Sequence, residues 1–257
     1  MIVRKTDREV DTMAEAGVVV ASTLDLLERE ARPGVTLGAL DAMAEQHIRA
    51  AGGVPTFKGY RGFPGSICAS PNDMIVHGIP GEYALQHGDL LSLDVGVTLN
   101  GFVADSAITI PIEQASPEAQ RLIDICEQSL RAGIEECRSG NRLGDISHAV
   151  QEVVEAAGFS VVRALVGHGV GRSMHEEPQI PNYGPAGRGP KLAPGMVFAI
   201  EPMITAGDWA VRSGDDGWAI YTVDQSLAAH CEHTVAITSN GPRILTLRQP
   251  ARPVGAG

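Results

Sequence analysis

The stretch GDLLSLD at residues 88–94 decides the fold, because a related stretch, GMVFAIE, occurs at residues 195–201. Both are short apolar runs that end in an acid, and a shift of 107 residues places Asp94 opposite Glu201. Apolar runs of this length bounded by glycine are typical of buried β-strands. We therefore predict two equivalent strands, each of which carries a carboxylate at the same position.

A second pair of acids follows the same order along the chain. DSAITI at residues 105–110 resembles EHTVAI at residues 232–237, which places Asp105 opposite Glu232. Strands are predicted at 90–97, 103–112, 196–201 and 232–237. Two pairs of equivalent strands indicate that the chain contains an internal repeat.

Helical patterns repeat with a nearly identical offset. A shift of 106 residues gives seven identities in 21 positions, from Arg32 opposite Arg138 to Gly52 opposite Gly158. Alanine and glycine at helix ends match easily by chance, but the ordered series of helix, strand and acid is harder to explain that way. Helices are predicted at about 6–32, 37–52, 116–140 and 143–157. The pattern predicts one pseudo-symmetric α/β domain over 1–257, with repeats at 6–112 and 116–247 and a flexible tail at 248–257.

Composition limits the classes of function. The 257 residues carry 20 basic and 31 acidic side chains, a formal net charge of −11, which argues against nucleic acid or an anionic membrane as the main partner. The apolar runs are too short to span a bilayer, and the N-terminus lacks the apolar core of a signal peptide. Four cysteines without a CxxC pair suit a reducing compartment. A cytoplasmic protein is expected.

The four repeated acids require an explanation, because carboxylates in apolar strands are costly unless they are paired or bind a metal. Any one of Asp94, Asp105, Glu201 and Glu232 could be a strand-end acid that reaches solvent. Four of them at equivalent positions would converge between the two halves and repel one another. Divalent cations relieve such repulsion.

Histidines near these acids add nitrogen donors. GHGVGRSMHEEP at residues 167–178 contains His168 in a glycine-rich bend and His175 seven residues later, and His77 stands at a turn in MIVHGIP. A lone histidine is usually structural. The remaining histidines have weaker cases as ligands: His47, His87, His148, His230 and His233.

One imidazole with four carboxylates is a hard, oxygen-rich ligand set. Such a set suits two divalent ions better than a structural zinc, which usually has thiolate ligands. Two bound ions can activate a water and polarise a carbonyl, so the residues favour metal-assisted hydrolysis. Competing motifs are absent: no GxSxG elbow, no GxxxxGK[ST] loop, and a GxGxxG pattern broken by Arg172.

Together, these motifs resemble the type I methionine aminopeptidases over about residues 4–247. The resemblance is carried by PNDMIVHGIP, GDLLSLDVGV, GFVADSAIT, GHGVGRSMHEEP, PGMVFAIEPM and CEHTVAIT. It implies the pita-bread fold, an α/β (α+β) domain with a pseudo-two-fold axis and a central curved antiparallel sheet. It also implies removal of the initiator methionine from nascent chains whose second residue is small, through a metal-bridged water or hydroxide.

The resemblance assigns the metal ligands residue by residue. Asp94 holds one ion, Asp105 and Glu232 bridge both, and His168 and Glu201 complete the other. Glu201 is also the expected general base. The two ions are Co²⁺, Mn²⁺, Fe²⁺ or Zn²⁺, and the sequence does not choose among them.

Substrate contacts are implied in the same way. His175 would stabilise the oxyanion, and His77 would contact the scissile amide. The residues expected around the methionine side chain are Tyr60, Phe63, Cys68, Met174 and Trp218. Their alternative role is that of ordinary core residues.

Several positions depart from the family pattern while staying apolar or small. These departures are Phe63 for Tyr, Val76 for Cys, Val103-Ala104 for His-Gly, and Met174 for Phe. A monovalent-cation site made by backbone oxygens is a further hypothesis, weakened because Ala228 replaces a usual Ser. Its residues would be Asn72, Met74 and Ala228.

Two alternatives stay open from the sequence. Another pita-bread peptidase, such as an Xaa-Pro aminopeptidase or dipeptidase, usually has a large N-terminal domain for which this chain has no room. A non-catalytic binding relative would be expected to lose metal ligands, and all five candidates are present. The expected partners are nascent polypeptide N-termini near the ribosome, with no nucleic acid or membrane partner, and the protein is expected to be a monomer.

Overall fold

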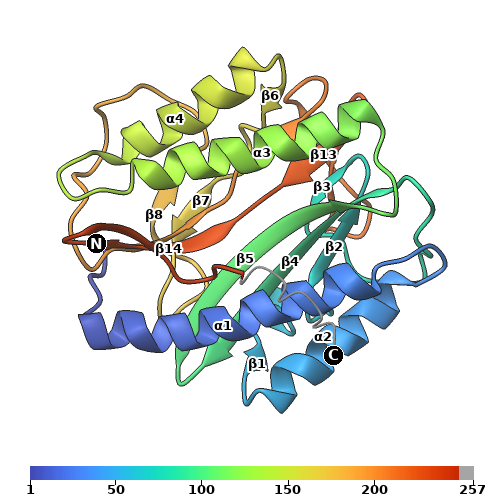
Figure 1. The fold of residues 1–257 in the computed structure, drawn as a ribbon, viewed down its shortest axis with the longest axis horizontal. Helices are drawn as coiled ribbons and strands as arrows, with labels where there is room; N and C mark the ends of the chain where they lie inside the picture. The colour runs from blue at the N-terminus through green and yellow to red at the C-terminus, as the bar shows by residue number, and fades with distance from the viewer. Residues whose placement is uncertain (249–257) are drawn as a thin grey trace, which may run out of the picture.

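Two pairs of helices form the outer layers of the molecule, and antiparallel strands lie between them (Figure 1). The computed structural model describes residues 1–248. The helices are α1 (Asp7–Glu30), α2 (Leu37–Ala50), α3 (Pro117–Glu135) and α4 (Leu143–Ala156). In Figure 1, α1 and α2 cover one side of the strands and α3 and α4 the other.

Within residues 1–248, the strands form four small sheets. The first contains β1 (Val54–Pro55), β2 (Cys68–Pro71), β4 (Leu90–Leu99) and β5 (Phe102–Pro111). A second contains β7 (Gly167–Gly169), β8 (Glu176–Ile180), β9 (Val197–Ile200), β14 (His233–Thr238) and β15 (Gly241–Ile244). A third joins β6 (Ser160–Val161), β10 (Met203–Thr205) and β13 (Ala228–His230), and a fourth joins β3 (Met74–Val76), β11 (Val211–Ser213) and β12 (Ile220–Thr222).

Helix starts follow the local sequence. Thr6 accepts a hydrogen bond from the backbone N–H of Glu9, whose side chain accepts from Thr6 in return, so a capping box begins α1 at the predicted start. Ser116 caps α3 ahead of Pro117, also at the predicted helix start. The predicted third helix was too long, because α3 ends at Glu135 rather than near residue 140.

Each helix pair packs over its own apolar core. Side chains from α1, α2, β4 and β5 form one core, and side chains from α3, α4, β9 and β14 form the other. Helices α2 and α4 have the same length and begin 106 residues apart, and β4 and β9 begin 107 residues apart. The elements thus lie at the offsets found in the sequence.

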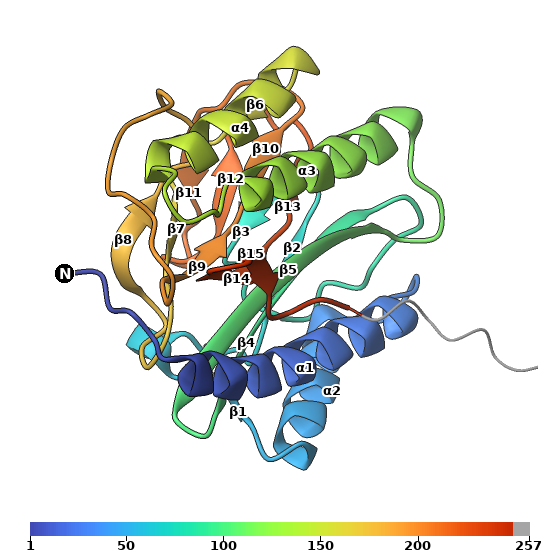
Figure 2. The same cartoon turned by 60° about the vertical axis from the view of Figure 1, so that its left-hand side comes forward.

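Hydrogen bonds join the two halves at the centre of the molecule. The N–H of Glu232 donates to the backbone oxygen of Ala107 at 2.9 Å, and Thr234 Oγ1 both accepts from the N–H of Asp105 and donates to its carbonyl oxygen. These bonds place β5 beside β14, as Figure 2 shows. Two predicted acids are thereby brought to the junction of the halves.

The chain end was predicted to be flexible from residue 248. Arg248, the residue of this tail that the structure describes, forms ion pairs with Asp25 and Glu28 on α1, and the flexibility of the tail stays a prediction. Residues 249–257 lie outside the described part of the chain. None of the helices within residues 1–248 combines the length and the apolar character needed to cross a bilayer.

Candidate metal centre

The β4–β5 hairpin presents two carboxylates on one face. Asp94 on β4 lies opposite Ala107 on β5, and Asp105 on β5 lies opposite Gly96. Directly paired residues of an antiparallel sheet point to the same side, as do residues two apart along a strand. Asp94 and Asp105 therefore project from the same face.

The other two carboxylates stand where two strands of the second half meet. His233 on β14 pairs with Ile200 on β9, so Glu232 and Glu201 occupy adjacent positions just beyond the paired residues. Both side chains line the same cavity as Asp94 and Asp105. The fold therefore brings all four predicted acids together.

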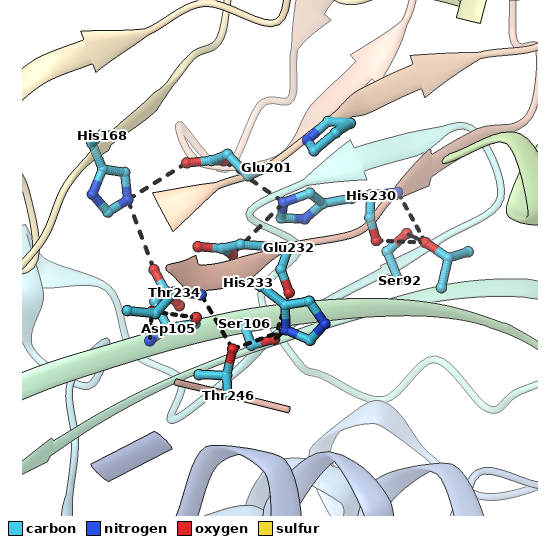
Figure 3. Close-up of polar contacts among 12 residues, drawn as sticks. Ser92, Asp105, Ser106, His168, Glu201, His230, Glu232, His233, Thr234 and Thr246 are labelled. Atoms are coloured by element: carbon cyan, nitrogen blue, oxygen red, sulfur yellow. Dashed lines mark hydrogen bonds and ion pairs between the residues drawn. The ribbon is translucent and has the colours of Figure 1, made fainter. Parts of the chain in front are cut away.

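His168 completes this cluster. It lies on β7, and its Nε2 is 3.5 Å from Glu201 Oε1 and 3.8 Å from Asp105 Oδ2 (Figure 3). Its Nδ1 is 2.9 Å from the carbonyl oxygen of Gly169, an arrangement that places the proton on Nδ1 and leaves Nε2 free to bind a metal. A Cβ at Gly169 would lie only 2.2 Å from the oxygen of Glu177, so glycine is required beside this histidine.

The charges of the cluster require a cation. Asp105 and Glu232 are each only 2% exposed, and Asp94 Oδ1, Asp105 Oδ1 and Glu232 Oε1 have no hydrogen-bond partner within residues 1–248. Ligand atoms of Asp105, His168 and Glu232 lie within 4.8 Å of one another. Buried carboxylates without partners are expensive, so the donor set fits divalent metal ions.

The pKa values of these four acids also reflect the free-energy cost of burying their charged forms. Burial raises the pKa of Asp94 to about 7. Burial, followed by the charges of Glu232 and Asp94, raises the pKa of Asp105 well above its usual range. The pKa values of Glu201 and Glu232 rise for the same two reasons, burial and neighbouring carboxylates. Without metal, the cluster therefore holds protons that a metal must displace.

His175 lies against this cluster but outside it. Its ring centroid is 4.3 Å from that of His168, and its Nδ1 is 2.8 Å from Tyr60 Oη. The following residue, Glu176, forms a buried ion pair with Lys5 and accepts the N–H of Arg172. These contacts hold the turn that carries His175.

His77 reaches the same cavity from the end of β3. Its backbone has φ of 61°, a left-handed conformation that is uncommon outside glycine and asparagine. Burial lowers its pKa, which keeps the imidazole neutral. Strain of this kind occurs often at functional sites, and its presence here supports a role for His77 in the site.

Every predicted catalytic, metal-ligating and methionine-pocket residue lines one cavity of about 180 Å³. Its apolar wall holds all five residues predicted for the methionine pocket, and Phe63 meets Trp218 edge-to-face at 5.1 Å between ring centroids. Phe57 and Arg61 also line it and were not predicted. The full lining is Phe57, Tyr60, Arg61, Phe63, Cys68, His77, Asp94, Asp105, His168, Met174, His175, Glu201, Trp218 and Glu232.

His230 also lies beside the cluster, although its sequence context made only a weak case for it as a ligand. It lies at the end of β13, and its Nε2 is 3.7 Å from Glu201 Oε2 and 3.9 Å from Glu232 Oε2. Burial, and secondarily the charge of His77, lowers its pKa to about 3. Its position two residues before Glu232 was the one available signal, because alternate residues of an extended chain point to the same side.

Two residues predicted for the monovalent-cation site, Asn72 and Ala228, bond each other. The carbonyl oxygen of Asn72 accepts a hydrogen bond from the N–H of Ala228 at 3.0 Å. Asn72 has φ of 58°, and its side chain bonds Asp89 and Leu90. The monovalent cation stays a prediction.

Residues 11–239 match the model of metallopeptidase family M24. The chain belongs to this family. It is 52% identical to the methionine aminopeptidase of Clostridium perfringens, over 96% of this chain and 99% of that protein. It is 50% identical to methionine aminopeptidase 1 of Bacillus subtilis, with the same coverage of both chains.

Solved structures agree with this family assignment. The crystal structure of methionine aminopeptidase from Thermotoga maritima superposes with a TM-score of 0.95 at 42% identity, covering 97% of this chain and all of that one. A prolidase from Pyrococcus furiosus gives a TM-score of 0.78 at 20% identity, covering 96% of this chain and 66% of that one, and shows the shared fold alone. The fold is the pita-bread fold, and the family likeness makes this M24 protein a hydrolase, as the sequence predicted.

The pH dependence of stability gives a first test of the centre. The raised pKa of Asp94 means that, above about pH 4, the folded metal-free protein binds more protons than the unfolded chain. The contribution of Asp94 to folding is therefore complete at low pH and is lost as pH rises through about 7. We expect the melting temperature of metal-free wild type to fall across this window relative to that of Asp94→Asn, by calorimetry.

Bound metal should reverse this loss. Metal displaces the protons, so the rise in melting temperature upon metal addition should grow with pH. Identical pH slopes for wild type and Asp94→Asn, with or without metal, would contradict the assignment of Asp94 to the centre.

Proposed function

We propose that this M24 hydrolase is a metal-dependent aminopeptidase that removes the initiator methionine from nascent proteins whose second residue is small. One observation carries the proposal: the carboxylate cluster and the apolar residues proposed to hold a methionine side chain line a single cavity. A cleavage centre and a side-chain pocket in one cavity are what an enzyme needs to act on one terminal residue. The relatives named methionine aminopeptidase support the same activity.

Two divalent ions, held by the five proposed ligands, would supply a polarised scissile carbonyl and an activated water. The proposed ligands are Asp94, Asp105, His168, Glu201 and Glu232. Co²⁺, Mn²⁺, Fe²⁺ and Zn²⁺ all suit these donors. The carboxylates also attract the free α-amino group of a substrate, which marks the end of a chain.

Proton movement is assigned to Glu201. Its carboxylate lies between His168 and His230, within the buried cluster, where it is placed to take a proton from an attacking water. We propose that Glu201 accepts this proton and later returns it to the leaving amine.

The two remaining histidines act on the scissile bond. His175 Nε2 is free to donate to the oxyanion, because Nδ1 is within bonding distance of Tyr60 Oη. Burial, followed by the charges of His168, Arg61 and His77, lowers the pKa of His175 to about 4, so it acts as a neutral donor. His77, on the strained turn after β3, is proposed to contact the scissile amide.

The methionine side chain is proposed to lie against the apolar wall. Met174 and Phe63 are 6% and 3% exposed, and Cys68 lies directly opposite Asp94 in the sheet. The register of β2 and β4 supports a pocket beside the cluster. Tyr60 and Trp218 complete this wall.

Nascent polypeptide N-termini near the ribosome are the proposed cellular substrates, and the protein is proposed to act as a cytoplasmic monomer. The support is chemical: the carboxylates and the apolar wall of one cavity suit a methionine with a free α-amino group, as at the start of a nascent chain. The net charge of −11 supports the absence of a dedicated nucleic-acid partner.

A paired peptide assay tests the function. Metal-loaded protein should hydrolyse Met-Ala-Ser with release of free methionine, measured by liquid chromatography, alongside metal analysis of the protein as purified. Leu-Ala-Ser and Met-Trp-Ser control for the first and second residues and should react far more slowly. Preferential cleavage of Xaa-Pro peptides would contradict the proposal and favour a proline-specific peptidase.

A further inference from the structure

His230 is fixed firmly by its backbone and points at the carboxylate cluster. Its N–H donates to Thr109 Oγ1 at 2.9 Å, and its carbonyl oxygen accepts from the same hydroxyl at 2.8 Å. Thr109 Oγ1 is also 2.9 Å from Ser92 Oγ, and all three residues are almost fully buried. The ring is therefore anchored on a rigid strand.

The side chain of His230 lacks a completed interaction. Its Nε2 is buried and has no hydrogen-bond partner within the described residues 1–248. It faces Glu201 Oε2 at 3.7 Å and Glu232 Oε2 at 3.9 Å, as Figure 3 shows. A buried polar atom left without a partner is unfavourable, so this nitrogen is placed for an interaction that completes on metal binding.

Glu201 is the carboxylate that both imidazoles flank. Its Oε1 faces His168, and its Oε2 faces His230 (Figure 3). His168 has its proton placed on Nδ1 by the carbonyl of Gly169, which leaves Nε2 as a metal donor. In residues 1–248, no protein acceptor fixes the proton of His230 on Nδ1 in this way, so Nε2 is free to carry it.

We infer that His230 is a positioning residue that donates an Nε2–H hydrogen bond to Glu201 Oε2 and so directs Oε1 toward the ion shared with His168. The inference rests on the proposed metal centre. Outer-shell hydrogen bonds of this kind fix the orientation of a ligating carboxylate, and their loss typically costs 10–100-fold in metal affinity. His230 acts through Glu201 and touches neither ion nor substrate.

The test compares two variants at the same position. His230→Gln keeps an N–H donor on a side chain of similar reach, whereas His230→Leu removes it. His47→Leu is the matched control, because His47 bonds Ser22 on the outer helices far from the cluster. Dissociation constants for Mn²⁺ are measured by calorimetric titration of each metal-free protein, with kcat and KM for Met-Ala-Ser on the saturated proteins.

The expected result is a weaker dissociation constant for one of the two ions in His230→Leu, by roughly 10-fold or more. His230→Gln should recover most of this loss, and His47→Leu should match wild type. At saturating Mn²⁺ the Leu variant should lower kcat and leave KM nearly unchanged. The melting temperature of the metal-free Leu variant should equal or exceed that of wild type, since an unpartnered polar atom is removed.

Three outcomes overturn the inference. Unchanged metal affinity in His230→Leu would mean that the ring only packs. Equal losses in His230→Leu and His230→Gln would assign the imidazole to the ion itself. A wild type that binds no Mn²⁺ would overturn the metal centre together with this inference, whereas the first two outcomes leave the proposed function standing.

Discussion

Asp105→Asn is expected to abolish metal-dependent turnover while making the metal-free protein more stable. Asp105 is buried at the junction of the halves, beside the carboxylates of Asp94 and Glu232. An amide cannot bridge two cations as a carboxylate does, so kcat/KM should fall by roughly 10³-fold or more, equivalent to about 4 kcal/mol. Removal of one like charge relieves repulsion in the empty cluster.

Opposite changes in activity and stability distinguish this loss from simple unfolding. Calorimetry should show a higher melting temperature for metal-free Asp105→Asn than for wild type near pH 8, and a much smaller rise on adding Mn²⁺. Asp89→Asn is the matched control, because Asp89 is also buried but accepts hydrogen bonds from Asn72, Tyr83 and Gln86. Asp89→Asn should lower the melting temperature and keep the response to metal. Full turnover by metal-saturated Asp105→Asn would refute the bridging role.

His175→Ala is expected to lower kcat by about 10²-fold, the effect of losing one oxyanion donor. KM and the binding of both ions should change little, because His175 packs against His168 without belonging to the five proposed ligands. Steady-state kinetics on Met-Ala-Ser and calorimetric metal titration measure these two effects separately.

Tyr60→Phe provides a graded comparison. It removes the hydroxyl that lies 2.8 Å from His175 Nδ1 while keeping the ring that lines the cavity. We expect a smaller fall in kcat, of about 10-fold, because the imidazole stays in place with its tautomer less well fixed. His87→Ala, an exposed imidazole away from the cavity, should match wild type. A loss of metal from His175→Ala would show that this histidine is a ligand instead.

Local sequence was sufficient for much of the fold. The capping box at Thr6 and the Ser116-Pro117 pair act over a few residues, so the starts of α1 and α3 were predicted correctly. The glycines after helices act over a similarly short range. The last turn of α3 was predicted less accurately than its start. Residues 136–140 contain no proline that would mark an earlier end of the helix, but the N–H of Gly140 donates to the carbonyl oxygen of Leu192, a partner that no local pattern reveals.

The repeat pattern drew attention to four acids and the family motifs added His168, and the structure places all five proposed metal ligands in one cavity. The duplication itself stays a prediction, supported by the offsets of α2 and α4. The likeness to methionine aminopeptidases depended on several motifs in order, which single residues could not have provided.

The sequence by itself determined the strands β4, β5, β9 and β14, the helix starts and the acids that stand out from apolar runs. Only the tertiary structure decided that His230, rather than another weak candidate such as His47, faces the cluster. The physical reason is that the direction of a side chain depends on strand pairing between distant segments, here Met203 opposite His230 and Thr109 bonded to its backbone. The sequence shows only that a histidine stands at position 230. Its burial without a hydrogen-bond partner in residues 1–248, close to Glu201 and Glu232, shows which groups it is placed to contact.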